Sequence, residues 1–203
     1  MMRAVLRFVA SVLIVSGVLM LSDAGATLLW QEPVSALLAD RQQGKLEEAL
    51  SSPKQRKRVI ERKPLPGDSI GKIVLPSLDR ELYVIEGTDL NDLRKGPGHY
   101  ADTPLPGERG TVAIAGHRTT YGAPFRKVDE LAEGDEIRVE MPYGRFTYRV
   151  EKTKIVDPTD LSVKDKVAYD RLVLTACHPL YSAAQRIVVF ARLQSRDKRS
   201  TVK

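Results

Sequence analysis

The chain has 203 residues, of which 42% are hydrophobic and 29% are charged, enough for one domain with a substantial core and an additional segment. Its formal net charge of +6 is uneven, because residues 1–65 carry ten Lys and Arg against six Asp and Glu, while the remainder carries 22 against 20. A nucleic-acid-binding protein needs a basic face on the folded domain itself, so this distribution argues against nucleic acid as a partner.

Residues 1–30 are predicted to anchor the chain in a membrane. Two arginines precede an uncharged apolar run from Phe8 to Leu21, which is of borderline length for a membrane-spanning helix. We favour a retained single-pass anchor that extends to Trp30; the alternative is a secretory signal cleaved at Ala24-Gly25-Ala26. Arginines before the span place the N-terminus inside, so the rest of the chain is expected outside the cell in both cases.

Residues 31–65 are predicted to form a partly helical stalk. Leu and Ala recur at helical spacing over residues 35–40 and 44–50, and a basic run follows at residues 54–58. The stalk is expected to hold the folded domain away from the membrane. The basic run is expected to lie in solvent, with contact to anionic headgroups as the alternative.

Residues 66–194 are predicted to form an all-β domain. Runs rich in strand formers recur between turn residues, and the expected strands are 70–75, 82–85, 111–115, 136–141, 145–155, 172–176 and 187–191. Short helical turns are expected at 89–93 and 125–131. Seven or eight short strands with so little helix indicate a barrel or a sandwich. The polar, basic end, residues 195–203, is expected to be disordered.

The only cysteine, Cys177, ends the apolar run Leu172–Ala176 and is a candidate nucleophile. Arg186 opens the next apolar run. Strands joined by a short loop usually pair antiparallel, so Arg186 is expected to return beside Cys177 and favour its thiolate. His117 follows the run Thr111–Ala115 and places a candidate base at another strand end. The alternative is that Cys177 is only a small buried apolar residue.

Three segments resemble the sortases, cell-surface transpeptidases of mostly Gram-positive bacteria. They are Thr103–Glu108, Ala113–Phe125 and Leu174–Cys177, followed by Arg186. The resemblance covers residues 66–194. It is strongest to class E, with class D as the near alternative, and implies a closed β-barrel of about eight strands with short helices.

Carried over from the sortases, Cys177 is the nucleophile, His117 the general acid/base and Arg186 the stabiliser of the oxyanion or of the bound peptide backbone. The resemblance implies cleavage of a surface protein's C-terminal sorting motif, of the LPxTG type or LAxTG for class E, between Thr and Gly through a thioester. An amine of a peptidoglycan precursor such as lipid II then accepts the acyl group. No cofactor and no metal are expected, because the aspartates of residues 157–170 are too scattered to indicate calcium.

Four further residues are assigned to substrate binding. Tyr121 is expected to line the groove and select alanine in the motif, with ordinary loop packing as the alternative. Thr175 either orients the site or fills a strand. Arg118 is expected as an exposed or groove-edge charge. His178 is expected as a loop contact, since neighbours on a strand point to opposite faces.

Two other functions stay open at this point. A membrane-tethered, non-catalytic β-barrel binding module would bury Cys177 as an inert residue. A pilus-polymerising sortase is the second, although no obvious lid with an Asp-Pro-aromatic motif precedes the barrel.

Overall fold

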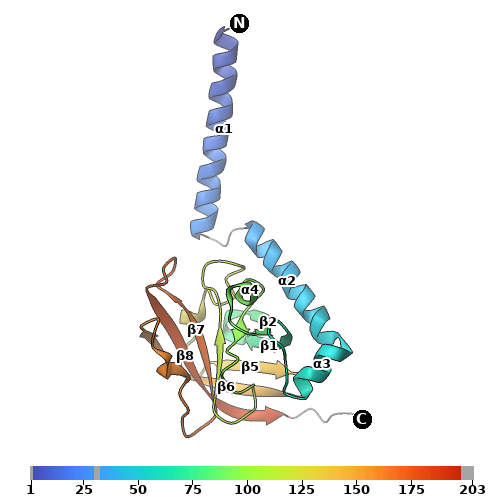
Figure 1. Ribbon diagram of the computed structural model, residues 1–203. Coiled ribbons are helices and arrows are strands. Elements are labelled where there is room, and N and C mark those ends of the chain that lie inside the picture. Colours follow the sequence, from blue (N-terminus) through green and yellow to red (C-terminus); the bar gives the residue numbers. More distant parts are fainter. Residues whose placement is uncertain (1, 30–32, 198–203) are drawn as a thin grey trace.

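Eight strands close into a barrel in the computed structural model, which describes residues 2–29 and 33–197 (Figure 1). Around the barrel the strands follow the order β1-β2-β3-β4-β7-β8-β6-β5. The prediction of an all-β barrel of about eight strands with short helices is confirmed. The strands are β1 (Ser69–Leu75), β2 (Arg80–Glu86), β3 (Gly98–His99), β4 (Thr111–Ala115), β5 (Glu136–Met141), β6 (Gly144–Val156), β7 (Arg171–His178) and β8 (Gln185–Asp197).

All seven predicted strands are present, and the C-terminal boundary of the barrel needs correction. β8 pairs with β6 as far as Asp197, so residues 195–197 belong to the barrel and not to a disordered tail. Residues 198–203 of that predicted tail lie outside the described residues. The unpredicted strand, β3, has two residues, which is too short for any sequence pattern to reveal.

The helical turns within the barrel are short. α4 (Leu90–Leu93) confirms the turn predicted at 89–93. The predicted turn at 125–131 is only a single turn of 3-10 helix, at Val128–Glu130. Further 3-10 turns lie at Pro76–Leu78 and Leu161–Lys164.

β4 and β7, which are neighbours in the barrel, are covered on both faces of the sheet. β4 buries all its residues and β7 its first six. One apolar cluster fills the barrel, and a second cluster on the outer face contains Ala113, Val173, Val188 and Phe190. Strands buried on both faces read as continuous apolar runs, which explains why these segments show no alternation in the sequence.

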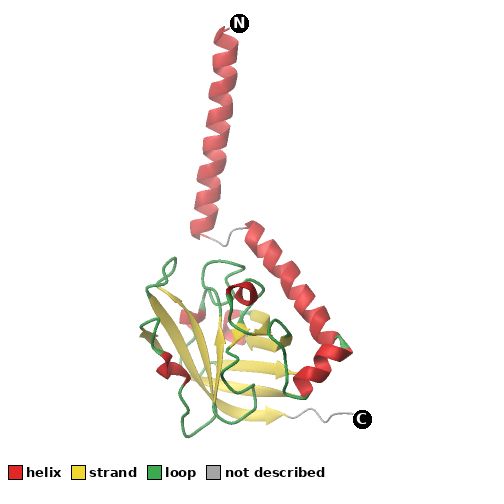
Figure 2. Cartoon of the chain, in the orientation of Figure 1, coloured by secondary structure: helices red, strands yellow, loops and turns green. Residues whose placement is uncertain are grey.

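The segment predicted as a stalk is helical, and its helices pack on the barrel. α2 (Pro33–Ser51) and α3 (Pro53–Ile60) run along one side of the barrel (Figure 2). Leu46 of α2 is buried, and Val59 of α3 belongs to the barrel core. These helices are part of the folded domain, which therefore begins well before residue 66.

The basic run of α3 is only partly in solvent. Arg58 pairs with Asp68 at 2.6 Å, at the point where the chain turns into β1. The remaining cations of the run, Lys54, Arg56 and Lys57, are exposed, as predicted.

Gln43 fixes α2 to the barrel. Its Oε1 accepts a hydrogen bond of 2.6 Å from the Tyr83 N–H, and its Nε2 donates one of 3.2 Å to the Lys95 carbonyl. β3 pairs only with Ile85 and Glu86 at the end of β2. Tyr83, which lies earlier in β2, therefore has no strand partner on the edge that faces α2. Gln43 satisfies one of them in place of a strand.

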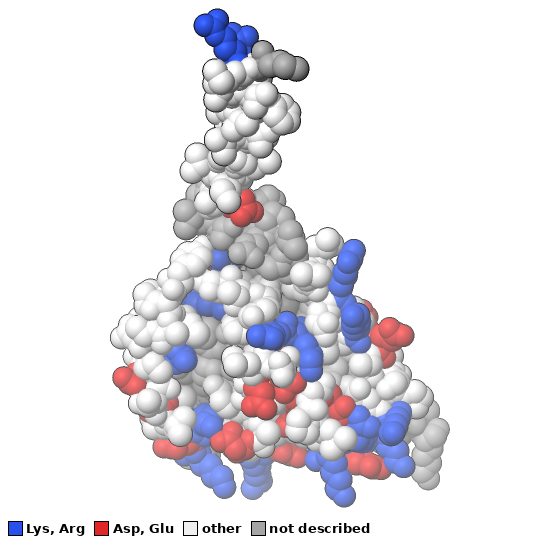
Figure 3. Space-filling model, turned by 45° about the horizontal axis from the view of Figure 1, so that its top comes forward, with Lys and Arg blue, Asp and Glu red and all other residues white. Residues whose placement is uncertain are grey.

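α1 (Met2–Leu29) has the properties of a membrane span. Its 25 residues Met2–Ala26 include a window of mean hydropathy 2.4 with none of it buried in the protein. Figure 3 shows an uncharged surface between the basic N-terminal end of this helix and an acidic residue near its other end. By length and composition α1 can cross a membrane, although a signal sequence would pass the same test. Trp30, the predicted end of the anchor, lies outside the described residues.

We expect Gln43→Ala to lower the free energy of unfolding by about 1 kcal/mol, because it leaves two partly buried backbone groups, the Tyr83 N–H and the Lys95 carbonyl, without this partner. Gln42→Ala is the matched control, since Gln42 lies on the same helix and has no side-chain hydrogen bond to other described residues. Denaturant unfolding of the full chain in micelles measures both. Equal losses in the two variants would show that Gln43 does not anchor α2.

Candidate active site

The backbone brings the His117 and Cys177 positions to the same ends of two neighbouring strands. β4 and β7 pair in parallel, with Ala115 opposite Thr175. His117 and Cys177 each follow that pair by two residues, and the Gly116 N–H donates to the Thr175 carbonyl at 3.0 Å. Because side chains alternate between the faces of a strand, equal offsets favour the same face for both residues.

Arg186 lies directly opposite Cys177 in the antiparallel pairing of β7 with β8, as predicted. Its Nη1 donates hydrogen bonds of 3.0 Å to the carbonyls of Ala183 and Gln185, which hold the guanidinium at the start of β8. An arginine has five N–H donors, so others remain for a ligand. Cys177 is partly exposed, unlike the inert, buried cysteine of the binding-module alternative.

The loop that follows His117 folds back beneath it. The Phe125 N–H donates to the His117 carbonyl at 3.0 Å. The Phe125 ring packs on Gly116 so closely that a Cβ added there would lie 2.5 Å from the ring. A glycine before His117 is therefore required for this packing, which sets the direction in which the loop leaves β4.

The imidazole of His117 is half-buried and contacts the Tyr121 ring, with 5.0 Å between the ring centroids and a tilt of 50° between the ring planes. Among the described residues, its Nε2 is buried and has no hydrogen-bond partner. Burial, and secondarily the positive charge of Arg94, lower the pKa of His117 below its usual value. At neutral pH the imidazole is therefore held in its neutral form and can accept a proton.

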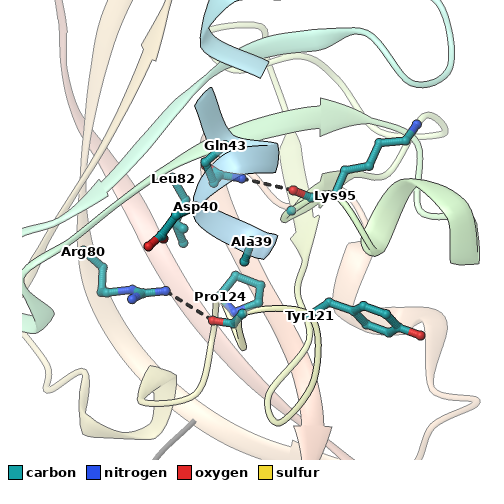
Figure 4. Close-up of a pocket in the computed structure, with 10 residues that line it drawn as sticks. Ala39, Asp40, Gln43, Arg80, Leu82, Lys95, Tyr121 and Pro124 are labelled. Carbon is teal, nitrogen blue, oxygen red and sulfur yellow. Dashed lines mark hydrogen bonds between the residues drawn. The ribbon is translucent and has the colours of Figure 1, made fainter. Parts of the chain in front are cut away.

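Helix α2 forms a wall against the same loop (Figure 4). A Cβ added to Gly122, whose φ is +74°, would lie 2.3 Å from the Cβ of Ala39. Arg80 donates to the Gly122 carbonyl at 3.5 Å from the other side. A small pocket between α2 and the loop is lined by Ala39, Gln43, Arg80 and Tyr121, among others. Helix α2, in the segment predicted as a stalk, thus restricts the loop that carries His117.

Arg118 differs from its prediction as an exposed or groove-edge charge, because its side chain is only 3% exposed. Its Nη1 lies 3.2 Å from Nδ1 of His178, and its Nη2 lies 2.6 Å from Asp129. His178 is the last residue of β7 and contacts Arg118. These two residues contact each other, which the sequence separation of sixty residues concealed.

Thr175 and Tyr121 have different surroundings. Thr175 is buried, and its hydroxyl lies 3.2 Å from the hydroxyl of Tyr100. Tyr121 is 40% exposed beside His117, a place from which it can reach a ligand. Three further contributions to the site carry no signal in the sequence, because only the folded chain brings them there: Arg94, Tyr100 and the loop-facing residues of α2.

The aspartates before β7 are engaged locally. Asp157 accepts from Thr159, and Asp160 accepts from Ser162. Within residues 2–29 and 33–197, no group of three or more His, Cys, Asp or Glu side chains is arranged to hold a metal ion.

We expect Arg94→Gln to raise the pKa of His117, because it removes a positive charge that disfavours the imidazolium. Burial, the larger cause, persists, so the pKa should stay below its usual value. An NMR titration of the His117 ring measures the change. Arg126→Gln, in the histidine loop itself, is the control, and an equal pKa in wild type and Arg94→Gln would contradict the assignment.

The chain is similar in sequence to known sortases. Residues 73–194 match the family model described as "Sortase domain". Sortase D of Bacillus subtilis is 38% identical over 146 residues, which cover 70% of this chain and 72% of that protein. Sortase SrtE1 of Streptomyces coelicolor is 28% identical over 210 residues, covering 96% of this chain and 58% of that protein.

A solved structure is similar to this chain in both fold and sequence. It is the crystal structure of Sortase E1 from Streptomyces coelicolor with a tripeptide in the active site, at 28% identity and a TM-score of 0.62 over 68% of this chain and 94% of that one. The prediction of class E or class D relatives is confirmed. With more than half of its length matched by the family model, the chain belongs to the sortase family of cysteine transpeptidases.

Proposed function

We propose that this protein is a membrane-anchored sortase in which Cys177, His117 and Arg186 cleave a sorting motif of the LAxTG or LPxTG type between Thr and Gly. The acyl group then passes to an amine of a peptidoglycan precursor such as lipid II. The observation that carries the proposal is the register of β4, β7 and β8, which aligns the three residues at adjacent strand ends.

The first half of the reaction forms a thioester. The Cys177 sulfur, as thiolate, attacks the carbonyl carbon of Thr, and the carbonyl electron pair moves onto its oxygen. Arg186 donates hydrogen bonds to that oxyanion. When the intermediate collapses, the C–N bond to Gly breaks, and the leaving amine takes a proton from His117. The acyl group remains on Cys177.

The state of His117 supports this role. Its lowered pKa keeps the imidazole neutral, so it can take the thiol proton and later return it to the leaving amine. In the second half, the acceptor amine attacks the thioester, loses a proton to His117 and restores the Cys177 thiol.

The position of Tyr121 supports a contact with the sorting motif. The tyrosine is exposed beside His117 in the loop restricted by α2. Sortase E1 of Streptomyces coelicolor binds a tripeptide in its active site. We place the residue before the variable position of the motif against Tyr121.

The N-terminal helices support action near the membrane surface. Arginines precede α1, so its N-terminus is assigned to the inside and the barrel to the outside of the cell. Only three residues separate α1 from α2, and α2 packs on the barrel. The catalytic domain is therefore held close to the membrane, where a lipid-linked amine acceptor lies.

Incubation of the protein with an LAxTG peptide and an amine should yield a thioester on Cys177 and an exchanged product, both detectable by mass spectrometry. Cys177→Ala should form neither. His117→Gln and Arg186→Gln should slow thioester formation by on the order of 10²- to 10³-fold. Ser182→Ala, in the loop between β7 and β8, is the control. Full activity of Cys177→Ala would contradict the proposed mechanism.

Tyr121→Ala should change the ratio of kcat/KM for LAxTG over LPxTG peptides by roughly 10-fold, the usual size of a single apolar contact in a specificity pocket. The preference is measured with both peptides in one competition reaction. A lower rate with an unchanged ratio would mean that Tyr121 supports His117 without selecting the motif.

A further inference from the structure

Arg118 is a buried cation, and each of its three guanidinium nitrogens has a polar partner. Nε donates to the Arg126 carbonyl at 3.3 Å, Nη1 lies 3.2 Å from His178 Nδ1, and Nη2 lies 2.6 Å from Asp129 Oδ2. Asp129 is 44% exposed, whereas Arg118 is 3% exposed. Burying a cation carries a large desolvation penalty, which only good geometry offsets, so this side chain is held in one arrangement.

The bond to His178 continues the pairing of β4 with β7 beyond its last backbone hydrogen bond. The backbone pairing ends where Gly116 donates to Thr175. Arg118 and His178 are the residues that immediately follow His117 and Cys177. A single guanidinium therefore joins the two chain segments that carry the proposed base and nucleophile.

The hydrogen bond also fixes the tautomer of His178. A guanidinium has only donors, so Nδ1 of His178 must accept. An imidazole nitrogen accepts only when it carries no proton, and the neutral ring then holds its proton on Nε2. The geometry thus assigns the Nε2–H form to His178.

We propose that Arg118 is a positioning residue that sets the relative placement of His117 and Cys177 through its hydrogen bond to His178. The consequence for catalysis rests on the proposed function, whereas the hydrogen bond itself does not. Arg118 does not touch the reacting atoms. Its guanidinium holds the end of β7 against the histidine loop, so a change there alters the placement of the two reacting side chains relative to each other.

The barrel offers a matched control at the opposite end of the same two strands. Arg171 begins β7 and is also buried; its Nε donates to Thr111 at 3.0 Å and its Nη2 to the Asp165 carbonyl at 2.9 Å. Arg118 and Arg171 thus link β4 to β7 at either end, but only Arg118 does so beside the candidate site. Arg171→Lys should cost stability without affecting the reaction.

The test compares Arg118→Lys with Arg171→Lys in the full chain. Lysine keeps the charge but loses the planar fork. For Arg118→Lys we expect kcat for peptide cleavage to fall on the order of 10²-fold, the effect of about 1 Å of misplacement, with KM changed less than about threefold. For Arg171→Lys we expect kcat within about twofold of wild type. Equal losses of kcat in the two variants would mean that Arg118 has only a structural role and would contradict the proposal.

His178 supplies a second arm that does not depend on folding of the Arg118 variant. His178→Asn keeps a carbonyl acceptor near the position of Nδ1 and should recover most of the kcat that His178→Ala loses. Equal kcat in the Asn and Ala variants would overturn the proposal.

NMR separates this inference from the proposed function. The ring nitrogens of His178 should report the Nε2–H tautomer in wild type and a mixture in Arg118→Lys. A mixture in wild type would refute the hydrogen bond. A wild-type protein that shows the tautomer but forms no thioester would refute the proposed function and leave the bond intact.

Discussion

The parallel pairing of β4 with β7 is the constraint on which the site depends. Five residue pairs, from Thr111–Arg171 to Ala115–Thr175, set the register. Because side chains alternate along a strand, a slip by one residue would turn the chain ends to opposite faces of the sheet. Both strands are buried on two sides, which makes such a slip costly. The antiparallel pairing of Cys177 with Arg186 then adds the third residue from the next strand.

The loop that carries His117 depends on contacts from elsewhere in the chain. Phe125 packs on Gly116 from within the loop, while α2 closes over Gly122 from outside. Since α2 follows the apolar helix α1 after three residues, the segment next to the candidate membrane span also packs on the loop that carries His117. The helices of residues 33–60 therefore pack on the barrel and do not project from it. A free stalk would leave the histidine loop exposed on this side.

Much of the barrel could be predicted from the sequence, because two-sided burial and alternation leave distinct patterns in strands such as β4 and β5. The strand ends at Cys177, His117 and Arg186 were predicted for the same reason. Other features have no local signal. Leu46 and Val59 look like residues of any amphipathic helix, and nothing in their spacing says that they pack on a barrel. In the sequence Arg118 resembles a surface arginine, because its partners His178 and Asp129 lie sixty and eleven residues away and contact it only in the folded chain.

The central claim is that the imidazole of His117 lies beside the sulfur of Cys177 in the folded chain. The pH dependence of Cys177 alkylation by iodoacetamide tests this most directly, since a neighbouring group that titrates changes the reactivity of a thiol. In wild type we expect two steps, one from the ionisation of His117 and one from that of the thiol. His117→Ala should lose the step due to the imidazole. A single step at the same pH in both proteins would contradict the claim.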